Sequence, residues 1–288
     1  MRPVRRIEQG LADITASDLS QRVPVPDTGD EIAGLATTVN ATLDRLEGAV
    51  ERLEGTVAQQ RRFTSDASHE LRTPLTGLRT RLELALDDPA DTDLLRTLRD
   101  ALRDADRLHQ IVDDLLALAR LDAGVEPDRT LLDLGALARA ESRRRQARVP
   151  VVVDADPDVP VLGNRLQLAR AVVNLLANAD RHASGKVLVT VRARGGKAVL
   201  TVTDDGPGVP PGERDRIFDR FTRLDAARSR DAGGSGLGLP IAREIANRHG
   251  GTLVVEDAPD GGAAFVLTLP LADQTAHEQD AGRRWARA

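Results

Sequence analysis

The feature that most constrains this chain is an apolar series with heptad spacing near its start. The series consists of aliphatic side chains three or four residues apart: Ile32, Leu35, Val39, Leu43, Leu46, Val50, Leu53 and Val57. One four-residue insertion interrupts the heptads, a stutter that locally unwinds a coiled coil. The spacing predicts a parallel helical dimer, because such a seam is buried only against another helix. A single amphipathic helix packed on the core of a monomer is the alternative.

A second helical pattern precedes this seam. The stretch between the two, SQRVPVPDTGDE, contains proline and glycine and cannot itself continue a helix. We therefore expect residues 1–57 to hold two helices joined by an extended connector.

Residues 58–123 are expected to form a helical hairpin. The first arm carries one leucine stripe, at Leu71, Leu75, Leu78, Leu82 and Leu86. It ends at Asp87-Asp88-Pro89, because the residue before a proline is pushed out of helical geometry. The second arm has a matching apolar series, at Leu94, Leu98, Ala101, Ala105, Leu108, Val112 and Leu115. Two such hairpins would bury both stripes in a four-helix bundle.

The pattern changes after Gly124. Strand-like runs at 149–154, 186–192, 198–204, 252–256 and 263–269 are interleaved with helical patterns at roughly 134–147, 164–183, 213–220 and 237–249. This spacing predicts an α/β sandwich domain over residues 124–273. Residues 274–288 are polar and without periodicity, and we expect them to form a flexible tail. The expected fold is thus a coiled-coil and four-helix-bundle dimer followed by an α/β domain.

Composition excludes several classes of function. The formal charge of −5 argues against general attraction to nucleic acid. The absence of cysteine excludes disulfides, thiolate nucleophiles and cysteine-based metal sites. No apolar stretch approaches the roughly 18 residues of a membrane span, so the chain as given is expected to be soluble.

His69 stands out among the five histidines because it lies about 160° from the leucine stripe of its helix, on the exposed face. Glu70 adjoins it, Thr73 follows one turn later on the same face, and Pro74 bends the backbone there. A carboxylate can hold an imidazole in one tautomer and accept its proton, so His69 is a candidate nucleophile. An ordinary solvated helix face is the alternative.

The helix expected at 164–183 carries a polar stripe beside its buried face, formed by Asn174, Asn178 and Arg181. Amide oxygens can ligate Mg²⁺ or its waters, and arginine can pair with phosphate. Solvent-facing polarity is the alternative interpretation.

Two glycine-rich turns follow. The first runs from Asp204, at a strand end, through Gly206 and Gly208, so a ligand can approach the backbone where the carboxylate offers an acceptor. A turn-stabilising aspartate is the alternative. The second, GGSGLGL at 233–239, opens a helix whose first amides would face phosphate oxygens. Neither turn is a P-loop or a dinucleotide fingerprint.

Taken in order, these residues resemble the sensor histidine kinases of two-component signalling along nearly the whole chain. Arg2-Pro3 with Asp30-Glu31-Ile32 resembles a HAMP signal-relay module, and FTSDASHELRTPL at 63–75 resembles the phosphoacceptor box. NLLANA at 174–179 resembles the asparagine box of the family. The remaining matches are the adenine box at Asp204, Gly206 and Gly208, the lid phenylalanines Phe218 and Phe221, and the phosphate-proximal glycines Gly234, Gly236 and Gly238.

The resemblance implies a phosphoryl relay that uses ATP and Mg²⁺. His69 would attack the γ-phosphoryl group with Glu70 as base, while Asn178 would ligate the metal and Asp204 would accept the adenine amine. A separate response regulator would then receive the phosphoryl group on an aspartate, and Thr73 would help to dephosphorylate it.

Further residues are carried over for nucleotide binding: Asn174, Arg181, His182, the two phenylalanines and the glycines. Many relatives have an aromatic residue where this chain has His182. The segment 211–235 is expected to be the lid, with Arg220 and Arg223 as phosphate contacts or as solvated side chains.

From the apolar seam and the hairpin stripes we expect a homodimer, and from the net charge we expect no nucleic-acid partner. Arg2, Arg5 and Arg6 suit the cytoplasmic side of a membrane helix, so we expect the cytoplasmic part of a receptor whose membrane segment lies upstream. Two other functions stay open: an ATP-dependent conformational clamp, and a dimeric relay with a decayed ATP site.

Overall fold

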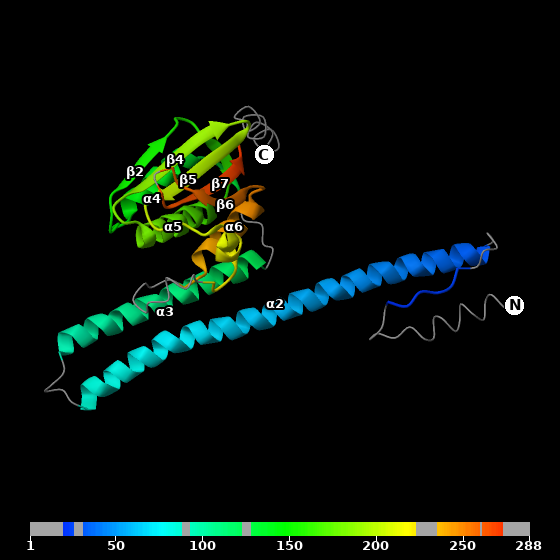
Figure 1. Cartoon of the computed structure of the whole chain (residues 1–288), viewed down its shortest axis with the longest axis horizontal. Coiled ribbons are helices and arrows are strands. Elements are labelled where there is room, and N and C mark those ends of the chain that lie inside the picture. Colours follow the sequence, from blue (N-terminus) through cyan, green and yellow to red (C-terminus); the bar gives the residue numbers. More distant parts are fainter. Residues whose placement is uncertain are drawn as a thin grey trace, which may run out of the picture. The chain divides into compact units, whose positions relative to one another are not determined.

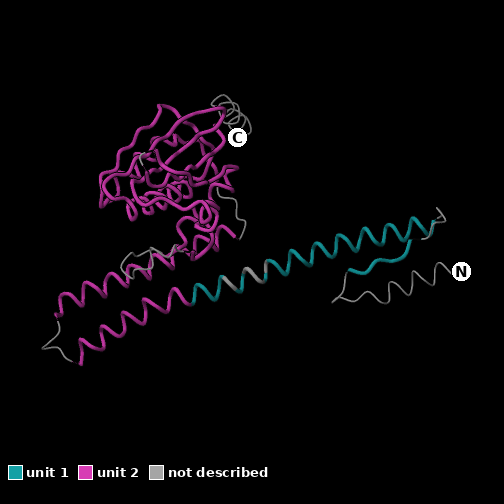
Figure 2. Tube along the Cα trace, in the orientation of Figure 1, with its two compact units in different colours: residues 1–68 teal, residues 69–288 magenta. Residues whose placement is uncertain are grey.

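The computed structural model describes residues 20–25, 31–87, 93–122, 128–222, 235–259 and 261–272. The chain divides into two compact units, residues 1–68 and 69–288 (Figure 2). The expected first helix of region 1–57, the break at Asp88-Pro89 and the tail 274–288 lie outside the described residues.

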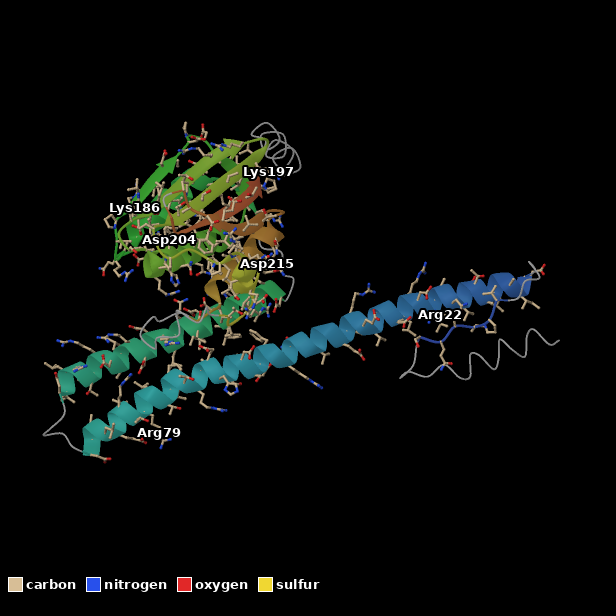
Figure 3. All side chains as sticks on the ribbon, viewed as in Figure 1. Arg22, Arg79, Lys186, Lys197, Asp204 and Asp215 are labelled. Atoms are coloured by element: carbon tan, nitrogen blue, oxygen red, sulfur yellow. The ribbon has the colours of Figure 1, made fainter. Side chains whose placement is uncertain are left out.

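Helix α2, Glu31–Asp87, is a single helix of 57 residues that carries the heptad seam and continues through Pro74 (Figure 1). In the first unit the connector lies along this helix. The backbone N–H of Val23 donates to Asn40 Oδ1 at 2.9 Å, and Asn40 Nδ2 donates back to the carbonyl of Val23 at 2.9 Å. Val23 is buried against Ala36 and Ile32. The labelled Arg22 (Figure 3) adds an ion pair to Asp44.

Helix α3, Leu94–Asp122, runs alongside the last turns of α2, as the hairpin pattern predicted (Figure 1). Ion pairs join the two arms, Arg81 with Asp104 and Arg107 with Glu70. These pairs keep part of their surface in water, and ion pairs that solvent reaches stabilise a fold by at most about 1 kcal/mol each. Most leucines of the two stripes stay exposed, including Leu75, Leu82, Leu86, Leu94 and Leu98.

A second apolar face of α3 was not predicted from the sequence. Ile111, Leu118 and Leu121 are almost fully buried, and this part of α3 packs against helix α6, Gly238–Arg248. Burying such side chains contributes about 1.5–3 kcal/mol each, which exceeds what the solvent-accessible ion pairs between the hairpin arms contribute.

The rest of the second unit is the expected α/β domain, which is confirmed. Its five-stranded sheet has the order β2-β4-β5-β7-β6, with β2 and β4 parallel and the other pairs antiparallel. These strands are β2 Val151–Ala155, β4 Val187–Arg194, β5 Lys197–Asp204, β6 Thr252–Asp257 and β7 Ala263–Pro270. A separate two-stranded sheet, β1 Thr130–Asp133 with β3 Pro160–Gly163, was not predicted.

Three helices cover one face of the five-stranded sheet: α4 Leu134–Arg144, α5 Arg165–His182 and α6 (Figure 1). Asn164 caps α5, because its Oδ1 accepts the Gln167 N–H at 3.0 Å. The prediction of a helix at 213–220 is wrong. Two 3-10 turns, η1 Pro211–Glu213 and η2 Arg216–Phe218, stand there instead. Only Ile217 and Phe218 are buried in them, so a longer helix would have no apolar face to pack.

His249, at the end of α6, fixes the start of α5. Its Nδ1 lies 2.7 Å from the carbonyl of Ile245, and its Nε2 accepts the Asn164 N–H at 3.1 Å. This pairing requires the neutral ring with its proton on Nδ1. Burial lowers the pKa of His249, in agreement with a neutral ring.

Among the described residues, none of the helices combines the length with the apolar run that crossing a bilayer needs.

Candidate functional site

Asp204 is a buried carboxylate at the end of β5 (Figure 3). It faces inward because it continues the alternation of Ala198, Leu200 and Val202, which point toward the covering helices. Its Oδ1 accepts the N–H groups of Gly206 at 3.0 Å and Ala263 at 3.3 Å. Its Oδ2 is buried and has no hydrogen-bond partner among the described residues.

Burial raises the pKa of Asp204. The two backbone N–H bonds and the neighbouring His182 favour the charged form and oppose this rise, but burial is the larger effect. An unpaired buried acceptor is costly unless a donor reaches it. The exocyclic amine of adenine is a donor of the right kind, so this atom fits a purine ligand.

Two glycines allow the backbone to close around this carboxylate. A Cβ at Gly206 would lie 2.4 Å from the carbonyl oxygen of His182. At Gly262, which has a φ of +92°, a Cβ would lie 2.1 Å from the carbonyl oxygen of Asp204. Gly208, also predicted, packs against the backbone of Gly262. Gly262 was missed, although the pair Gly261-Gly262 ahead of β7 is a signal that could have found it.

Asp205 was also missed as a site residue. Its carboxylate accepts the N–H groups of Ser184 at 2.8 Å and Gly185 at 3.0 Å, and so ties the loop after α5 to the turn after β5. These backbone bonds, with Gly185 first, lower the pKa of Asp205. Neighbouring aspartates therefore have pKa values shifted in opposite directions.

The asparagines of α5 have different surroundings. Asn174 Nδ2 donates to the carbonyl of Gly238 at 3.0 Å, which joins α5 to the start of α6. Asn178, one turn later, is half-buried, and its amide makes no hydrogen bond to any described residue. Its oxygen is free to ligate Mg²⁺ or a water of its shell.

The end of α5 carries the two basic candidates. Arg181 is exposed, and its carbonyl accepts a bond from Arg148 Nη2 at 3.3 Å. His182 is half-buried, and burial together with the charge of Arg181 lowers its pKa, whereas Asp204 acts in the opposite sense. His182 therefore lies within the electrostatic reach of the buried carboxylate.

The second glycine turn is tied to the lid phenylalanines. The N–H of Phe221 donates to the carbonyl of Gly236 at 3.0 Å. Phe218 is buried, with the guanidinium carbon of Arg243 4.8 Å from its ring centre. Gly234 and Arg223 lie outside the described residues. Arg220 Nη2 pairs with the carboxylate of Asp122 on α3 at 3.0 Å, a contact that the sequence did not predict.

The candidate nucleophile lies on α2. His69 is exposed, as predicted, and Glu70 beside it is half-buried. Arg107 Nη2 on α3 approaches the Glu70 carboxylate at 3.9 Å. The hydroxyl of Thr73 donates to the carbonyl of His69 at 3.2 Å.

The described residues thus form two groups. At Asp204 they combine a buried acceptor with backbone that only glycine can supply, and α5 adds the open amide of Asn178. Such a set of groups suits an adenine nucleotide with a metal ion. On α2 they present an imidazole and a carboxylate to solvent. Phosphoryl transfer needs both kinds of group, because it depends on charge neutralisation and on an oriented nucleophile.

Comparison with known families matches three parts of the chain. Residues 163–273 match the family described as "Histidine kinase-, DNA gyrase B-, and HSP90-like ATPase". Residues 59–124 match the "His Kinase A (phospho-acceptor) domain", and residues 1–48 match the HAMP domain.

Curated relatives are similar along most of the chain. The probable sensor histidine kinase TcrY of Mycobacterium tuberculosis is 35% identical over 93% of this chain and 60% of its own length. The sensor histidine kinase MtrB of Mycobacterium bovis is 38% identical over 93% of this chain and 49% of its own. The chain therefore spans only about half to three fifths of these relatives.

Two solved structures are similar over 71% of the chain. ShkA, solved at full length in complex with AMPPNP, is 31% identical with a TM-score of 0.54, and the match covers 44% of that chain. The Acinetobacter baumannii histidine kinase AdeS is 24% identical with a TM-score of 0.58 over 98% of its chain, a likeness of fold.

We expect Asp204→Asn to raise the free energy of unfolding at pH 7.5. The change removes a charge that burial disfavours and keeps an oxygen for the Gly206 and Ala263 amides. The wild-type carboxyl has a raised pKa and is protonated in the folded state as the pH falls, so the advantage should shrink in acid.

The matched control is Asp205→Asn. It should lower the free energy of unfolding at pH 7.5, because the ionised carboxylate accepts the Ser184 and Gly185 amides. Since the pKa of Asp205 is lowered, this loss should fade as the pH drops below about 4. Urea denaturation at pH 7.5 and at about pH 3 measures both effects. Shifts of the same sign in the two variants would contradict the assignment.

Proposed function

The chain belongs to the sensor histidine kinases of two-component signalling, and on this basis we propose that it transfers the γ-phosphoryl group of ATP to His69 and from there to an aspartate of a response regulator. The observation that carries the proposal is the pairing, in one chain, of the exposed His69-Glu70 on α2 with the Asp204 group on the α/β domain.

For the nucleotide group, the proposal assigns Asp204 to the adenine amine and the amides of the loop at Gly236 to the phosphates. Asn178 would hold Mg²⁺, with Asn174, Arg181 and His182 around it. When bound, Mg²⁺ would neutralise charge on the phosphate oxygens. Phe218 and Phe221, which lie within the lid segment 211–235, would anchor this segment to the domain.

For the histidine, the proposal assigns the attack on the γ-phosphorus to the imidazole of His69. The bond from phosphorus to the bridging oxygen breaks and ADP leaves, while Glu70 takes up the proton that the imidazole loses. Arg107 Nη2 lies 3.9 Å from the Glu70 carboxylate, close enough to attract it but too far away for a hydrogen bond. The product is a phosphohistidine that a receiver aspartate can attack.

The domain assignment is part of the same proposal. Residues 1–57 would relay the signal, residues 58–123 would dimerise and accept the phosphoryl group, and residues 124–273 would bind ATP. The match to HAMP over residues 1–48 supports an upstream membrane sensor, so we propose a cytoplasmic location for this part of a receptor. Recovery of the full receptor in the soluble fraction after cell fractionation would contradict this.

We expect His69→Gln to abolish retained label after incubation with γ-labelled ATP, while nucleotide affinity stays within about twofold, since the histidine and the nucleotide group lie far apart in the chain and share no partner. Retained label should be labile in acid and stable in base.

His109→Gln, at an exposed histidine of α3, is the matched control and should label normally. Label retained on the His69 variant would refute the nucleophile. Release of phosphate by the wild type without any retained label would favour the conformational clamp, and neither release nor label would favour a relay with a decayed ATP site.

The exposed leucines support a homodimer. The rest of the described chain leaves several hairpin leucines exposed, spaced four residues apart on each helix: Leu82 and Leu86 on α2, and Leu94, Leu98 and Leu102 on α3. A second hairpin would bury these side chains in a four-helix bundle.

Leu98→Glu should therefore weaken dimerisation by at least about tenfold, because a symmetric interface would bury the new charge twice. Leu166→Glu, at an 80% exposed leucine of α5, should leave it unchanged. Sedimentation at micromolar concentration measures both. A monomeric wild-type chain would contradict the bundle.

We also propose that Thr73 takes part in dephosphorylation of the regulator. Its hydroxyl donates to the carbonyl of His69, the bond that a purely structural role requires. The bond uses the hydroxyl proton and leaves the oxygen able to accept from an attacking water. Both interpretations therefore agree with the contact.

Thr73→Ala separates them. If the oxygen orients water, autophosphorylation should be normal while regulator phosphatase activity falls by about tenfold or more, and Thr73→Ser should restore it. If the role is structural, both activities should fall together with the melting temperature. Undiminished phosphatase activity in Thr73→Ala would end the hypothesis, and His69→Gln controls for reverse transfer.

A further inference from the structure

Asp114 on α3 is a buried carboxylate to which the proposed relay gives no role. It is 2% exposed, and its oxygens accept three hydrogen bonds. Gln110 Nε2 and Arg170 Nη2 donate to Oδ1 at 3.0 and 2.8 Å, and Ser235 Oγ donates to Oδ2 at 2.8 Å. A carboxylate is buried only where donors replace water, so these donors stabilise it.

Two of the three donors come from the α/β domain. Arg170 lies on α5 and also donates to the carbonyl of Asp113 at 2.8 Å. Ser235 lies in the loop that leads through Gly236 to the start of α6. Asp114 therefore joins the hairpin to α5 and to this loop, the two elements that carry Asn178 and Gly236 in the proposed nucleotide site. All of them belong to the second compact unit (Figure 2).

The hydroxyl of Ser235 is both a hydrogen-bond donor and an acceptor. It donates to Asp114, and its oxygen accepts the N–H of Leu237 at 3.2 Å. The strong carboxylate acceptor fixes the hydroxyl rotamer, so that a lone pair faces Leu237. Leu237 is the residue immediately before α6, where backbone amides would meet phosphate oxygens. An amide bound to Ser235 is not available to a phosphate.

We propose that Asp114 is a positioning residue that acts through Ser235 to hold the Leu237 amide away from nucleotide phosphates. The inference rests on the proposed nucleotide site. There, the Ser235 hydroxyl, held by Asp114 of the hairpin, competes with the phosphates for the Leu237 amide. Contact between α3 and this loop lowers nucleotide affinity. By linkage, nucleotide binding weakens the contact between the loop and α3 by the same factor.

The test is binding of MgADP to the full chain, measured by calorimetry at fixed pH and salt. Asp114→Asn keeps the shape of the side chain and weakens the acceptor, so affinity should rise about three- to tenfold, the range for loss of one net hydrogen bond. A merely structural role for Asp114 would lower affinity instead.

Asp113→Asn is the matched control. It removes the same charge from the adjacent position, where the side chain is exposed and bonds to no described residue, and should leave affinity unchanged. Ser235→Ala frees the Leu237 amide directly and should also raise affinity. Asp114→Asn should then add nothing in the Ser235→Ala background, because both act through one bond.

Unchanged or weaker MgADP binding by Asp114→Asn, with a wild type that binds, overturns this inference alone. A wild type that binds no MgADP overturns the proposed function as well. If Asp114→Asn lowers the melting temperature so far that binding cannot be measured, Ser235→Ala decides: raised affinity supports the inference, and equal or weaker affinity overturns it.

Discussion

The alternation along β5 is the constraint on which the proposed nucleotide site depends. Because every second residue of the strand faces the helices, a carboxylate two positions after Val202 must be buried. Asp204 persists there since its Oδ1 receives two backbone N–H bonds, and these exist only because glycine at 206 and 262 lets the backbone close in. The unpartnered Oδ2 is the polar group that this arrangement leaves for a ligand.

Neighbouring carboxylates in this region differ by environment alone. Asp204 is desolvated and its pKa rises, whereas Asp205 is only half-buried and its carboxylate is bound by backbone amides, so its pKa falls. The first is suited to recognise a donor, and the second fixes the loop at Ser184 and Gly185. Two consecutive residues at the end of β5 thus have different roles: Asp204 is placed to recognise a ligand, and Asp205 supports the backbone.

The fold was predictable where periodicity was long. The seam from Ile32, the exposed face of His69 and the strand phase that buries Asp204 all follow from spacing. The four-residue strands β1 and β3 were not predicted, because runs this short show no recognisable alternation of apolar and polar residues. The 213–220 segment was mistaken for a helix, since sequence spacing does not reveal that only one turn is buried. Contacts of the site made by single residues, such as those of Asp114, Asp205 and Gly262, depend on partners distant in sequence.

The two faces of α3 place it between the proposed dimer and the nucleotide site. Its leucines at 94, 98 and 102 are exposed on the hairpin, while Ile111, Leu118 and Leu121 pack on the α/β domain next to Asp114. The apolar contacts hold this helix on the domain, and the buried carboxylate adds a directional bond to the loop at Ser235. Because buried polar bonds are lost as soon as their geometry changes, a small shift of α3 would break that bond while the apolar contact persists. A helix with these two kinds of contact can therefore transmit a change in the hairpin to the nucleotide loop without leaving the domain.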